Sequence, residues 1–354
     1  MSLMTSPEIS PATAHALPAP HLPSTAAWHG VVPLPELGVL QAAGPDTAAF
    51  LHGQLSQDIE HLGAHQARLA AYCSAKGRML ASAIALRPQA DAAWLVCDAS
   101  VLPATLKRLK MFVLRAKTAL TDGSDTVRVL GLAGAPVQAS LQVEGLPEQA
   151  AHTATSATDA PWPVHPLHGG QLIGLPSVLG IPRWMWVGPV AAAEALLARW
   201  PALAAPAWAW LDVMSAIPRI QAATADQFVP QMVNFELLGG VNFQKGCYPG
   251  QEVVARSQYR GTVKRRAVLA HSAEPLQAGQ ELFAENDPTQ PAGLVIQSAA
   301  IPSEDGSVAG TAHSALVEIK LAAWQTPVRA GSGEGPLLQW DAVPYDLAHD
   351  VTAA

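Results

Sequence analysis

The chain has 354 residues, of which 49% are hydrophobic and 14% are charged, so it can bury a large core and has a length typical of two or three domains. Acidic residues outnumber basic ones, and the net charge of -7 argues against a general nucleic-acid binder. No apolar run reaches the roughly 18 residues of a membrane span, and three cysteines without a CxxC spacing indicate a reducing compartment, so we expect a cytoplasmic protein.

The first predicted segment is a leader. Residues 1–27 are rich in Ala, Pro, Ser and Thr and contain no Lys or Arg. A secretory signal needs a basic start and an apolar stretch, so this composition excludes an ordinary one. We therefore interpret residues 1–27 as a disordered leader.

The next part of the chain predicts mixed α and β structure. Residues 38–42 predict a strand, and Asp46 is placed to cap a helix that follows it. Further strands are predicted at residues 69–72 and 79–86, on either side of a Lys76-Gly77 turn, and at residues 94–97. The Leu spacing in residues 101–110 favours an amphipathic helix, and the Val, Phe and Leu content of residues 111–120 favours a strand.

The second half of the chain changes from mixed to all-β character. Residues 145–161 are rich in Ala, Thr and Pro and predict a loop between subdomains. A strand at 184–187 and a helix at 190–200 are predicted next. After residue 266, short apolar runs separated by Gly, Pro, Asn and Asp turns predict an all-β module.

The most informative motif is KGCYPGQE, residues 245–252. Pro249 and Glu252 suit the first turn of a helix, and Gly261 suits its end. A thiol ahead of a helix N-terminus and near Lys245 is expected to have a lowered pKa. The alternative is that Cys247 is a small buried hydrophobic residue, but glycines and a proline around one thiol favour a functional loop.

This region resembles the YgfZ-type folate-binding proteins. The resemblance rests on FVPQMVNFELLGGVNFQKGCYPGQEVVARSQYRGTVKRR at 228–266, with GPDTAAFLHGQLSQDI at 44–59, AAYCSAKGRML at 70–80 and LKRLKMFVLRAKTAL at 106–120. These proteins share a superfamily with the aminomethyltransferase, or T-protein, of the glycine cleavage system. The resemblance covers most of the chain and fits loosely after residue 266.

The resemblance implies an α+β fold and a tetrahydrofolate cofactor. Two interwoven α/β subdomains, at residues 28–266, would surround a central opening, followed by an antiparallel β-barrel at 267–345 and a tail at 346–354. Trp208 is the candidate for the pterin side, with core packing as the alternative. Gln54 and Asp58, one turn apart, are candidates for the same opening, with a solvated helix face or a cap as the alternative.

Other site residues follow from the motif and from nearby cations. The resemblance implies functional roles for Lys245 and Cys247 and places Tyr248, Gln251 and Glu252 of the motif near the folate. The resemblance makes Arg115 and Arg256 candidates for contacts with an anion or the acidic folate tail, with a solvated surface face as the alternative. Direct nucleic-acid binding is not expected, because few aromatic residues lie among the cations. No HxxxH or HExxH spacing predicts a metal site.

One departure separates this chain from the aminomethyltransferases. They carry an Asp-Asp pair on the strand after the glycine turn, and that pair falls near Leu80 and Ala81 here. The Glu that holds the pterin in that branch falls near Met214, and a frequent glycine of the family is Ala216. Without these carboxylates, acid–base chemistry on a folate-bound aminomethyl group has no agent.

Two functions remain open. The resemblance implies a tetrahydrofolate-binding accessory factor in iron–sulfur cluster assembly or repair, which supports iron–sulfur enzymes that include tRNA-modifying ones. Its partners would be iron–sulfur client or assembly proteins, with Cys247 as the key residue. The alternative is a folate-dependent one-carbon transferase with Cys247 as the nucleophile, for which the sequence identifies no general base.

Overall fold

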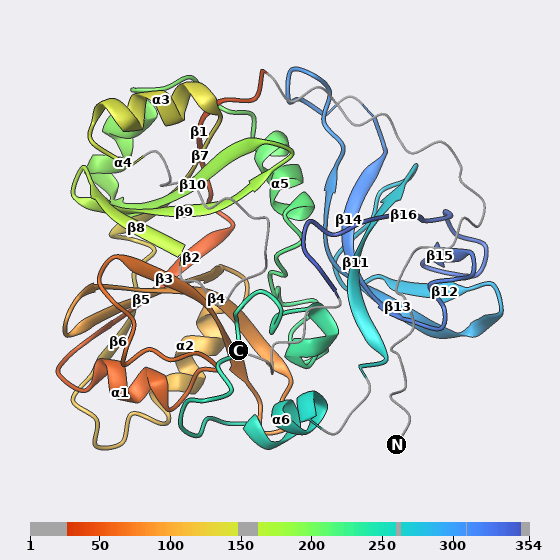
Figure 1. The fold of residues 1–354 in the computed structure, drawn as a ribbon, viewed down its shortest axis with the longest axis horizontal. Coiled ribbons are helices and arrows are strands. Elements are labelled where there is room, and N and C mark those ends of the chain that lie inside the picture. The colour runs from red at the N-terminus through yellow and green to blue at the C-terminus, as the bar shows by residue number, and fades with distance from the viewer. Residues whose placement is uncertain (1–26, 148–161, 260–262, 309, 348–354) are drawn as a thin grey trace, which may run out of the picture.

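The structure is a computed structural model that describes residues 27–147, 162–259, 263–308 and 310–347. Two β-sheets lie on either side of a central helix (Figure 1). The leader up to residue 26, linker residues 148–161, Gly261 and tail residues 348–354 lie outside the described residues, so those predictions stay untested. No helix of the described residues is long and apolar enough to cross a membrane.

The larger sheet has ten strands, and every ladder between its named strands is antiparallel. Its spatial order is β1-β7-β10-β9-β8-β3-β4-β5-β2-β6. The strands are β1 (Gly30–Pro33), β2 (Leu37–Ala43), β3 (Gln66–Cys73), β4 (Met79–Gln89), β5 (Ala92–Asp98), β6 (Ala119–Asp122), β7 (Val127–Ala133), β8 (Trp162–Leu167), β9 (Gly170–Val178) and β10 (Ile181–Pro189).

The chain passes between the two halves of this sheet. β1 pairs with β7 in one half, β2 to β6 form the other half, and the chain then returns for β7 to β10. The two halves meet where β3 pairs with β8, at Gln66 with Pro163 and Ala67 with Trp162. Buried Ala and Leu side chains of β3 fit this central place.

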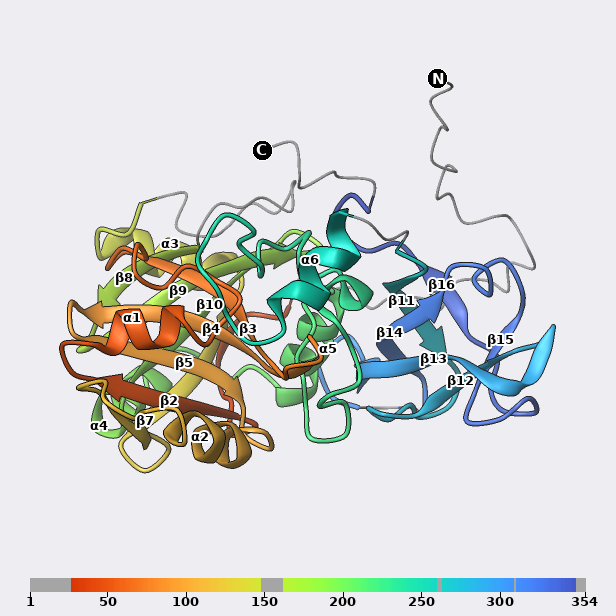
Figure 2. The same ribbon diagram turned by 90° about the horizontal axis from the view of Figure 1, so that it is seen from below.

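Six helices and one 3-10 turn complete the described residues. They are α1 (Thr47–His52), α2 (Leu102–Lys110), α3 (Ala135–Val143), α4 (Val190–Leu197), α5 (Ala205–Met214), the turn Pro230–Val233 and α6 (Gln251–Tyr259). A proline in the first turn starts α2, α3 and α5. α5 lies between the two sheets in both ribbon views (Figures 1 and 2). Its Trp210 side chain donates from Nε1 to Ser314 Oγ of the smaller sheet at 2.8 Å.

The smaller sheet confirms the all-β character predicted after residue 266. Its order is β15-β12-β13-β14-β11-β16. The strand order ends at β15 and β16, but Leu337, two residues before β16, bridges to Arg329 of β15, so the sheet curls toward the predicted barrel. The strands are β11 (Arg265–Ser272), β12 (Glu281–Ala284), β13 (Asp287–Ala300), β14 (His313–Lys320), β15 (Val328–Ala330) and β16 (Gln339–Asp341).

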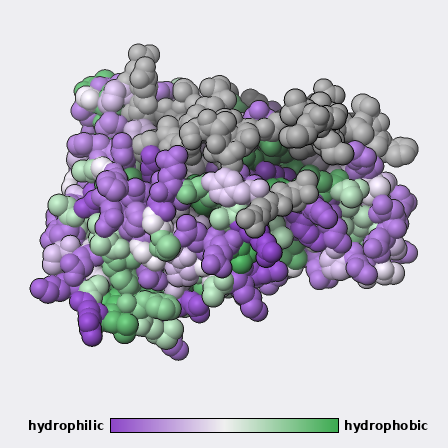
Figure 3. Space-filling model, turned by 60° about the horizontal axis from the view of Figure 1, so that its bottom comes forward, coloured by the Kyte–Doolittle hydropathy of each residue, from purple (hydrophilic) through white to green (hydrophobic). Residues whose placement is uncertain are grey.

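The strand predicted at 111–120 is wrong for most of its length. Only Ala119–Asp122 forms a strand, where the edge of β2 offers pairing partners. Met111, Phe112 and Leu114 are exposed, and Leu114 is 84% exposed. A strand forms only where a partner strand pairs with it, so apolar content alone misled the prediction here. Figure 3 shows apolar surface on one face of the molecule as patches bordered by hydrophilic side chains.

The predicted cap of α1 is right in position and wrong in chemistry. Asp46 is the N-cap residue, but its side chain makes no capping hydrogen bond. Asp46 Oδ2 instead accepts the Lys117 backbone N–H at 2.7 Å. The Asp46 carboxylate therefore fixes the chain ahead of β6 against the start of α1.

Candidate functional site

The thiol loop, residues 245–250, is held in place by glycine conformations. Gly250 has φ +80°, and a Cβ there would lie 2.4 Å from the Ser74 carbonyl oxygen. Gly77, in the turn between β3 and β4, has φ +71° and faces Gly250 and Val253. Only glycine combines this backbone conformation with such close approach. The loop therefore packs on the β3–β4 turn, and α6 begins at Gln251 with Glu252 in its first turn, as the motif predicted.

Lys245 ties the thiol loop to the end of α1. Its Nζ donates to the backbone oxygens of His52 and, at 2.6 Å, of Leu55. It also lies 5.0 Å from the centroid of the Tyr248 ring. Burial lowers the pKa of Lys245 to about 8, although the nearby Asp58, Glu60 and Cys247 act in the opposite direction. The C-terminal carbonyls of α1 suit a cation at this place.

The three cysteines have different surroundings. Cys247 is exposed, whereas Cys73 and Cys97 are buried. Burial raises the pKa of both buried thiols to about 12, so neither holds a thiolate at neutral pH. Next to Cys247, the buried Tyr248 phenol also has a raised pKa, because burial disfavours its anion. Cys247 is therefore the accessible thiol of this chain, as predicted.

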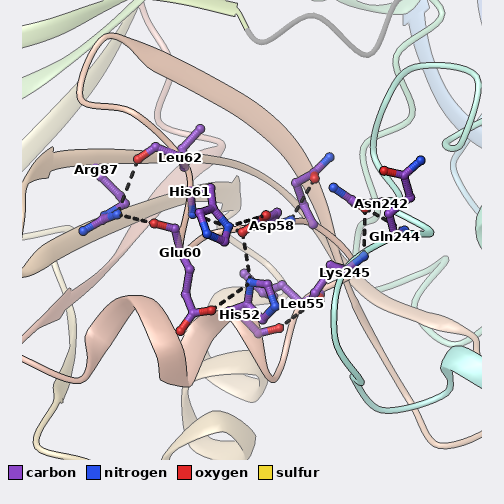
Figure 4. Close-up of polar contacts among 11 residues, drawn as sticks. His52, Leu55, Asp58, Glu60, His61, Leu62, Arg87, Asn242, Gln244 and Lys245 are labelled. Atoms are coloured by element: carbon purple, nitrogen blue, oxygen red, sulfur yellow. Dashed lines mark hydrogen bonds and ion pairs between the residues drawn. The ribbon is translucent and has the colours of Figure 1, made fainter. Parts of the chain in front are cut away.

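A carboxylate and two histidines lie beside the thiol loop (Figure 4). Asp58 Oδ1 is 3.0 Å from His52 Nδ1, and Asp58 Oδ2 is 2.8 Å from His61 Nδ1. Burial alone would raise the pKa of Asp58, but the hydrogen bonds from His61 and the charges of both histidines lower it. Because α1 ends at His52, Gln54 and Asp58 do not lie one turn apart on a helix, which corrects that prediction.

A second place, the central pocket, lies between the ten-stranded sheet and α5. Its cavity volume is about 60 Å³, and Trp208 and Asp212 of α5 both line it. Its other lining residues come from β2, β3, β4, β5, β10 and the chain after α5: Leu37, Leu69, Ser82, Ala83, Ile84, Val96, Cys97, Met185, Ile217, Pro218 and Arg219. The lining is thus largely apolar with a few charged groups, which is the usual chemistry of a small-molecule site.

Two arginines hold Asp212 at this pocket. Asp212 Oδ2 is 3.1 Å from Arg219 Nη1, and Asp212 Oδ1 is 3.7 Å from Arg183 Nη1. Arg183 is fully buried, its guanidinium carbon lies 5.3 Å from the centroid of the Trp208 ring, and burial lowers its pKa to about 10. Arg183 Nη1 has no hydrogen-bond partner among the described residues. The ion pair with Asp212 offsets part of the cost of burying the Arg183 charge and fixes the Asp212 carboxylate at the pocket.

The structure separates the predicted site residues into several places. Lys245, Cys247 and Tyr248 share the thiol loop with Asp58 beside it, whereas Trp208 lines the central pocket. Gln54 follows α1, and its Oε1 is buried without a hydrogen bond among the described residues. The others lie on α6 or in the exposed loop after α2: Gln251, Glu252 and Arg256 on α6, and Arg115 in that loop.

Sequence reasoning missed several of the polar groups that matter here. His52 and His61 flank Asp58 without any recognised spacing, and Arg183 and Asp212 come from β10 and α5. The backbone explains why a glycine is frequent in the family at the position of Ala216. Ala216 has a φ of +53°, a left-handed conformation that favours glycine. No carboxylate stands at Leu80 or Ala81 of β4, directly before the pocket residue Ser82.

Comparison with known proteins adds three findings. No family model matches the chain. It is 34% identical over 300 residues to the tRNA-modifying protein YgfZ of Sodalis glossinidius, covering 82% of this chain and 85% of that protein. It is 36% identical over 259 residues to the tRNA-modifying protein YgfZ of Photorhabdus laumondii, covering 71% and 74% of the two chains.

A solved structure shows the same fold. The glycine cleavage system aminomethyltransferase T from Bartonella henselae superimposes with a TM-score of 0.70 at 19% identity, covering 91% of this chain and 87% of that one. That likeness supports the expected α+β architecture with its curled second sheet. The sequence identity to relatives along most of their length goes further, and it shows that the chain belongs to the YgfZ family.

Proposed function

We propose that the central pocket binds tetrahydrofolate, with the pterin ring against Trp208. The observation that carries this is the Asp212 carboxylate, which lines the pocket together with Trp208 and is held there by Arg219 and the buried Arg183. A pterin presents N–H donors along one edge and a carbonyl oxygen beside them. The Asp212 carboxylate suits the donors, and the guanidinium of Arg219, which also lines the pocket, suits the carbonyl oxygen.

The charges around this pocket indicate which end of the folate lies inside it. Asp98 binds Arg219 at 3.3 Å, and Glu36 lies near Arg219, Asp212 and Asp98. Burial raises the pKa of Glu36. The neighbouring carboxylates of Asp212 and Asp98 raise it further, whereas the Arg219 cation lowers it. Three carboxylates disfavour the acidic glutamate tail of a folate here. The tail therefore points away from these carboxylates, out of the pocket.

In the cell, this chain acts as an accessory factor in iron–sulfur cluster assembly or repair in the cytoplasm. The relatives are named as tRNA-modifying proteins, and iron–sulfur enzymes that modify tRNA would be among the clients. Cys247 supports this role, because an exposed thiol on a packed loop is accessible to a partner protein. Soft thiolate chemistry suits the transfer of iron or sulfur units.

A one-carbon transferase remains the second candidate. The observation that favours it is the exposed Cys247 thiol next to an ordered His–Asp pair, which is a usual setting for a nucleophile. The missing carboxylates at Leu80 and Ala81 argue against aminomethyl transfer itself. We expect no methylenetetrahydrofolate from an aminomethyl-loaded carrier protein, and detection of that product would favour this second candidate.

Calorimetry with tetrahydrofolate tests the proposed pocket. We expect a dissociation constant on the order of micromolar for the unaltered chain. Trp208→Ala and Asp212→Asn should each weaken binding about tenfold or more, which equals roughly 1.4 kcal/mol. Trp200→Ala, which removes a tryptophan outside the pocket, is the control and should leave affinity unchanged. Absence of binding at millimolar folate would refute the proposal.

A deletion strain tests the cellular role. We expect reduced activity of several iron–sulfur enzymes, restored by the intact gene and not by a Cys247→Ala variant. Normal iron–sulfur activities in the deletion strain would contradict the assembly role, even where folate binding is measured.

A further inference from the structure

His52 is oriented by a carboxylate on one side of its ring. It is the last residue of α1, and its side chain is 15% exposed. Nδ1 lies 3.0 Å from Asp58 Oδ1. Asp58 is ionised at neutral pH, since its pKa is lowered, so a neutral imidazole carries its proton on Nδ1 and donates it to Asp58. The free electron pair of neutral His52 is therefore on Nε2.

The other side of the ring faces the thiol loop. A Cβ added to Gly246 would have His52 Nε2 as its nearest neighbour, at 3.6 Å. Gly246 directly precedes Cys247, and the backbone oxygen of His52 accepts from Lys245, which precedes Gly246. The ring of His52 therefore lies close to Gly246, and its backbone oxygen is hydrogen-bonded to Lys245, so His52 is near the exposed thiol.

We propose that His52, positioned by Asp58, is the proton acceptor for the Cys247 thiol. The S–H bond of Cys247 breaks, the proton bonds to His52 Nε2, and sulfur keeps the electron pair. The result is a thiolate beside an imidazolium that Asp58 stabilises. The thiolate is a stronger nucleophile than the thiol from which it forms. This deepens the proposed function at the same thiol and rests on the use of Cys247 there, but it does not depend on the folate pocket.

The groups around His52 fit this role. Lys245 from the thiol loop adds positive charge near the thiol. Glu60 lies 3.8 Å from His52 Nδ1 and adds to the negative charge of Asp58, and Arg87 from β4 binds the Glu60 backbone oxygen at 2.9 Å. His61 occupies the second oxygen of Asp58, and its side chain is 81% exposed. His61 therefore shares the carboxylate with His52 without the contact to the loop.

Alkylation of the native protein measures the thiol directly. Iodoacetamide is applied across a range of pH, and the modification of each cysteine is read by mass spectrometry. In the unaltered chain we expect Cys247 to react fastest. His52→Gln retains a polar side chain near Asp58 but cannot take the proton. We expect it to slow Cys247 alkylation at neutral pH by about threefold and to move the inflection to higher pH, since a smaller thiolate fraction outweighs the greater nucleophilicity of a more basic thiolate.

Two further variants separate orientation from general disturbance. Asp58→Asn removes the charge that stabilises the imidazolium and should slow alkylation in the same direction as His52→Gln. His61→Gln removes only the outer histidine and should leave the rate within about twofold. Each variant is first checked for an unchanged thermal melt, and where His52→Gln melts early, Asp58→Asn carries the test.

The results distinguish this inference from the folate proposal. An unchanged Cys247 profile in His52→Gln, or in a folded Asp58→Asn, would overturn the inference, as would an equal loss in His61→Gln. Calorimetry on His52→Gln should show unaltered folate binding, because His52 does not line the central pocket. Failure of the unaltered chain to bind folate, together with a shifted alkylation profile, would reject the folate proposal and retain this one.

Discussion

Two of the three thiols, Cys247 and Cys73, lead to opposite predictions at the level of single residues. Cys247 is exposed, so Cys247→Ala should change the free energy of unfolding by less than about 0.5 kcal/mol. Cys73 is fully buried in the main core cluster, so Cys73→Ala removes a packed sulfur and should cost about 1–2 kcal/mol. Urea denaturation of both variants checks this. A large loss in Cys247→Ala would make that thiol structural and would undermine its proposed function.

The importance of Asp212 depends on its surroundings rather than on its type. Arg219 and the buried Arg183 hold its carboxylate at the pocket, although the three residues belong to different segments. The carboxylate that the T-protein resemblance places near Met214 is absent, so Asp212 supplies the negative charge of this pocket from an earlier position on α5. An acidic residue in the sequence AWAWLDVM carries no signal of this role.

At the level of elements, the start of α6 depends on Gly250. Gly250→Ala would place a methyl group 2.4 Å from the Ser74 oxygen in a left-handed backbone conformation. We expect this variant to lose about 2 kcal/mol or more of stability and to displace the thiol loop from the β3–β4 turn. Gly310→Ala is the matched control, because no atom of the described residues lies within 4 Å of its added Cβ. Equal melting temperatures of the two variants would contradict this account.

Local patterns predicted the elements that have strong local causes. The strands at 69–72, 79–86 and 94–97 lie within β3, β4 and β5, and the helix at 101–110 matches α2. The strand predicted at 111–120 lacked such a cause. Within that segment β2 pairs only with residues 119 and 120, which begin β6. The order of ten strands and the join between β3 and β8 come from tertiary pairing that a single sequence does not display.

The same distinction holds for the site. The thiol loop was predictable because its glycines, proline and cysteine are adjacent in sequence. The contact of that loop with the end of α1 was not predictable. Lys245 and Leu55 are 190 positions apart in the sequence and meet only in the fold. The Arg183–Asp212 pair likewise joins β10 to α5. Chemistry that one segment carries is visible in sequence, whereas chemistry shared by distant segments is not.

At the scale of the whole molecule, buried polar contacts join the smaller sheet to the segment that precedes the thiol loop. Arg266 of β11 binds the Glu236 carboxylate and donates to the Gln231 backbone oxygen at 3.0 Å. Asn234 donates to the Ala267 backbone oxygen at 2.8 Å and lies 3.1 Å from the Tyr345 hydroxyl. These contacts need one defined geometry to satisfy every partner. The smaller sheet is therefore held in a fixed orientation beside the segment that leads to the thiol loop.

The Arg266–Glu236 pair gives a pH-dependent prediction at this scale. The Glu236 side chain is 1% exposed, and burial raises its pKa even with Arg266 beside it. Arg266→Ala leaves that carboxylate without its cation and should cost about 3–5 kcal/mol near neutral pH. An acid with a raised pKa in the folded state contributes stability at low pH and loses it as pH rises through that pKa. Removal of Arg266 raises the pKa of Glu236 further, so the loss should be larger at about pH 8 than at about pH 5.

Urea denaturation at both pH values measures this, with the double variant Arg266→Ala, Glu236→Gln as the control. The neutral amide of the double variant no longer titrates, so its difference from the unaltered chain should vary far less with pH than that of Arg266→Ala. It should also recover part of the lost stability, since a buried amide costs less than a buried unpaired charge. A loss in Arg266→Ala below about 1 kcal/mol at both pH values would show that the pair does not hold the smaller sheet to the segment that contains Glu236.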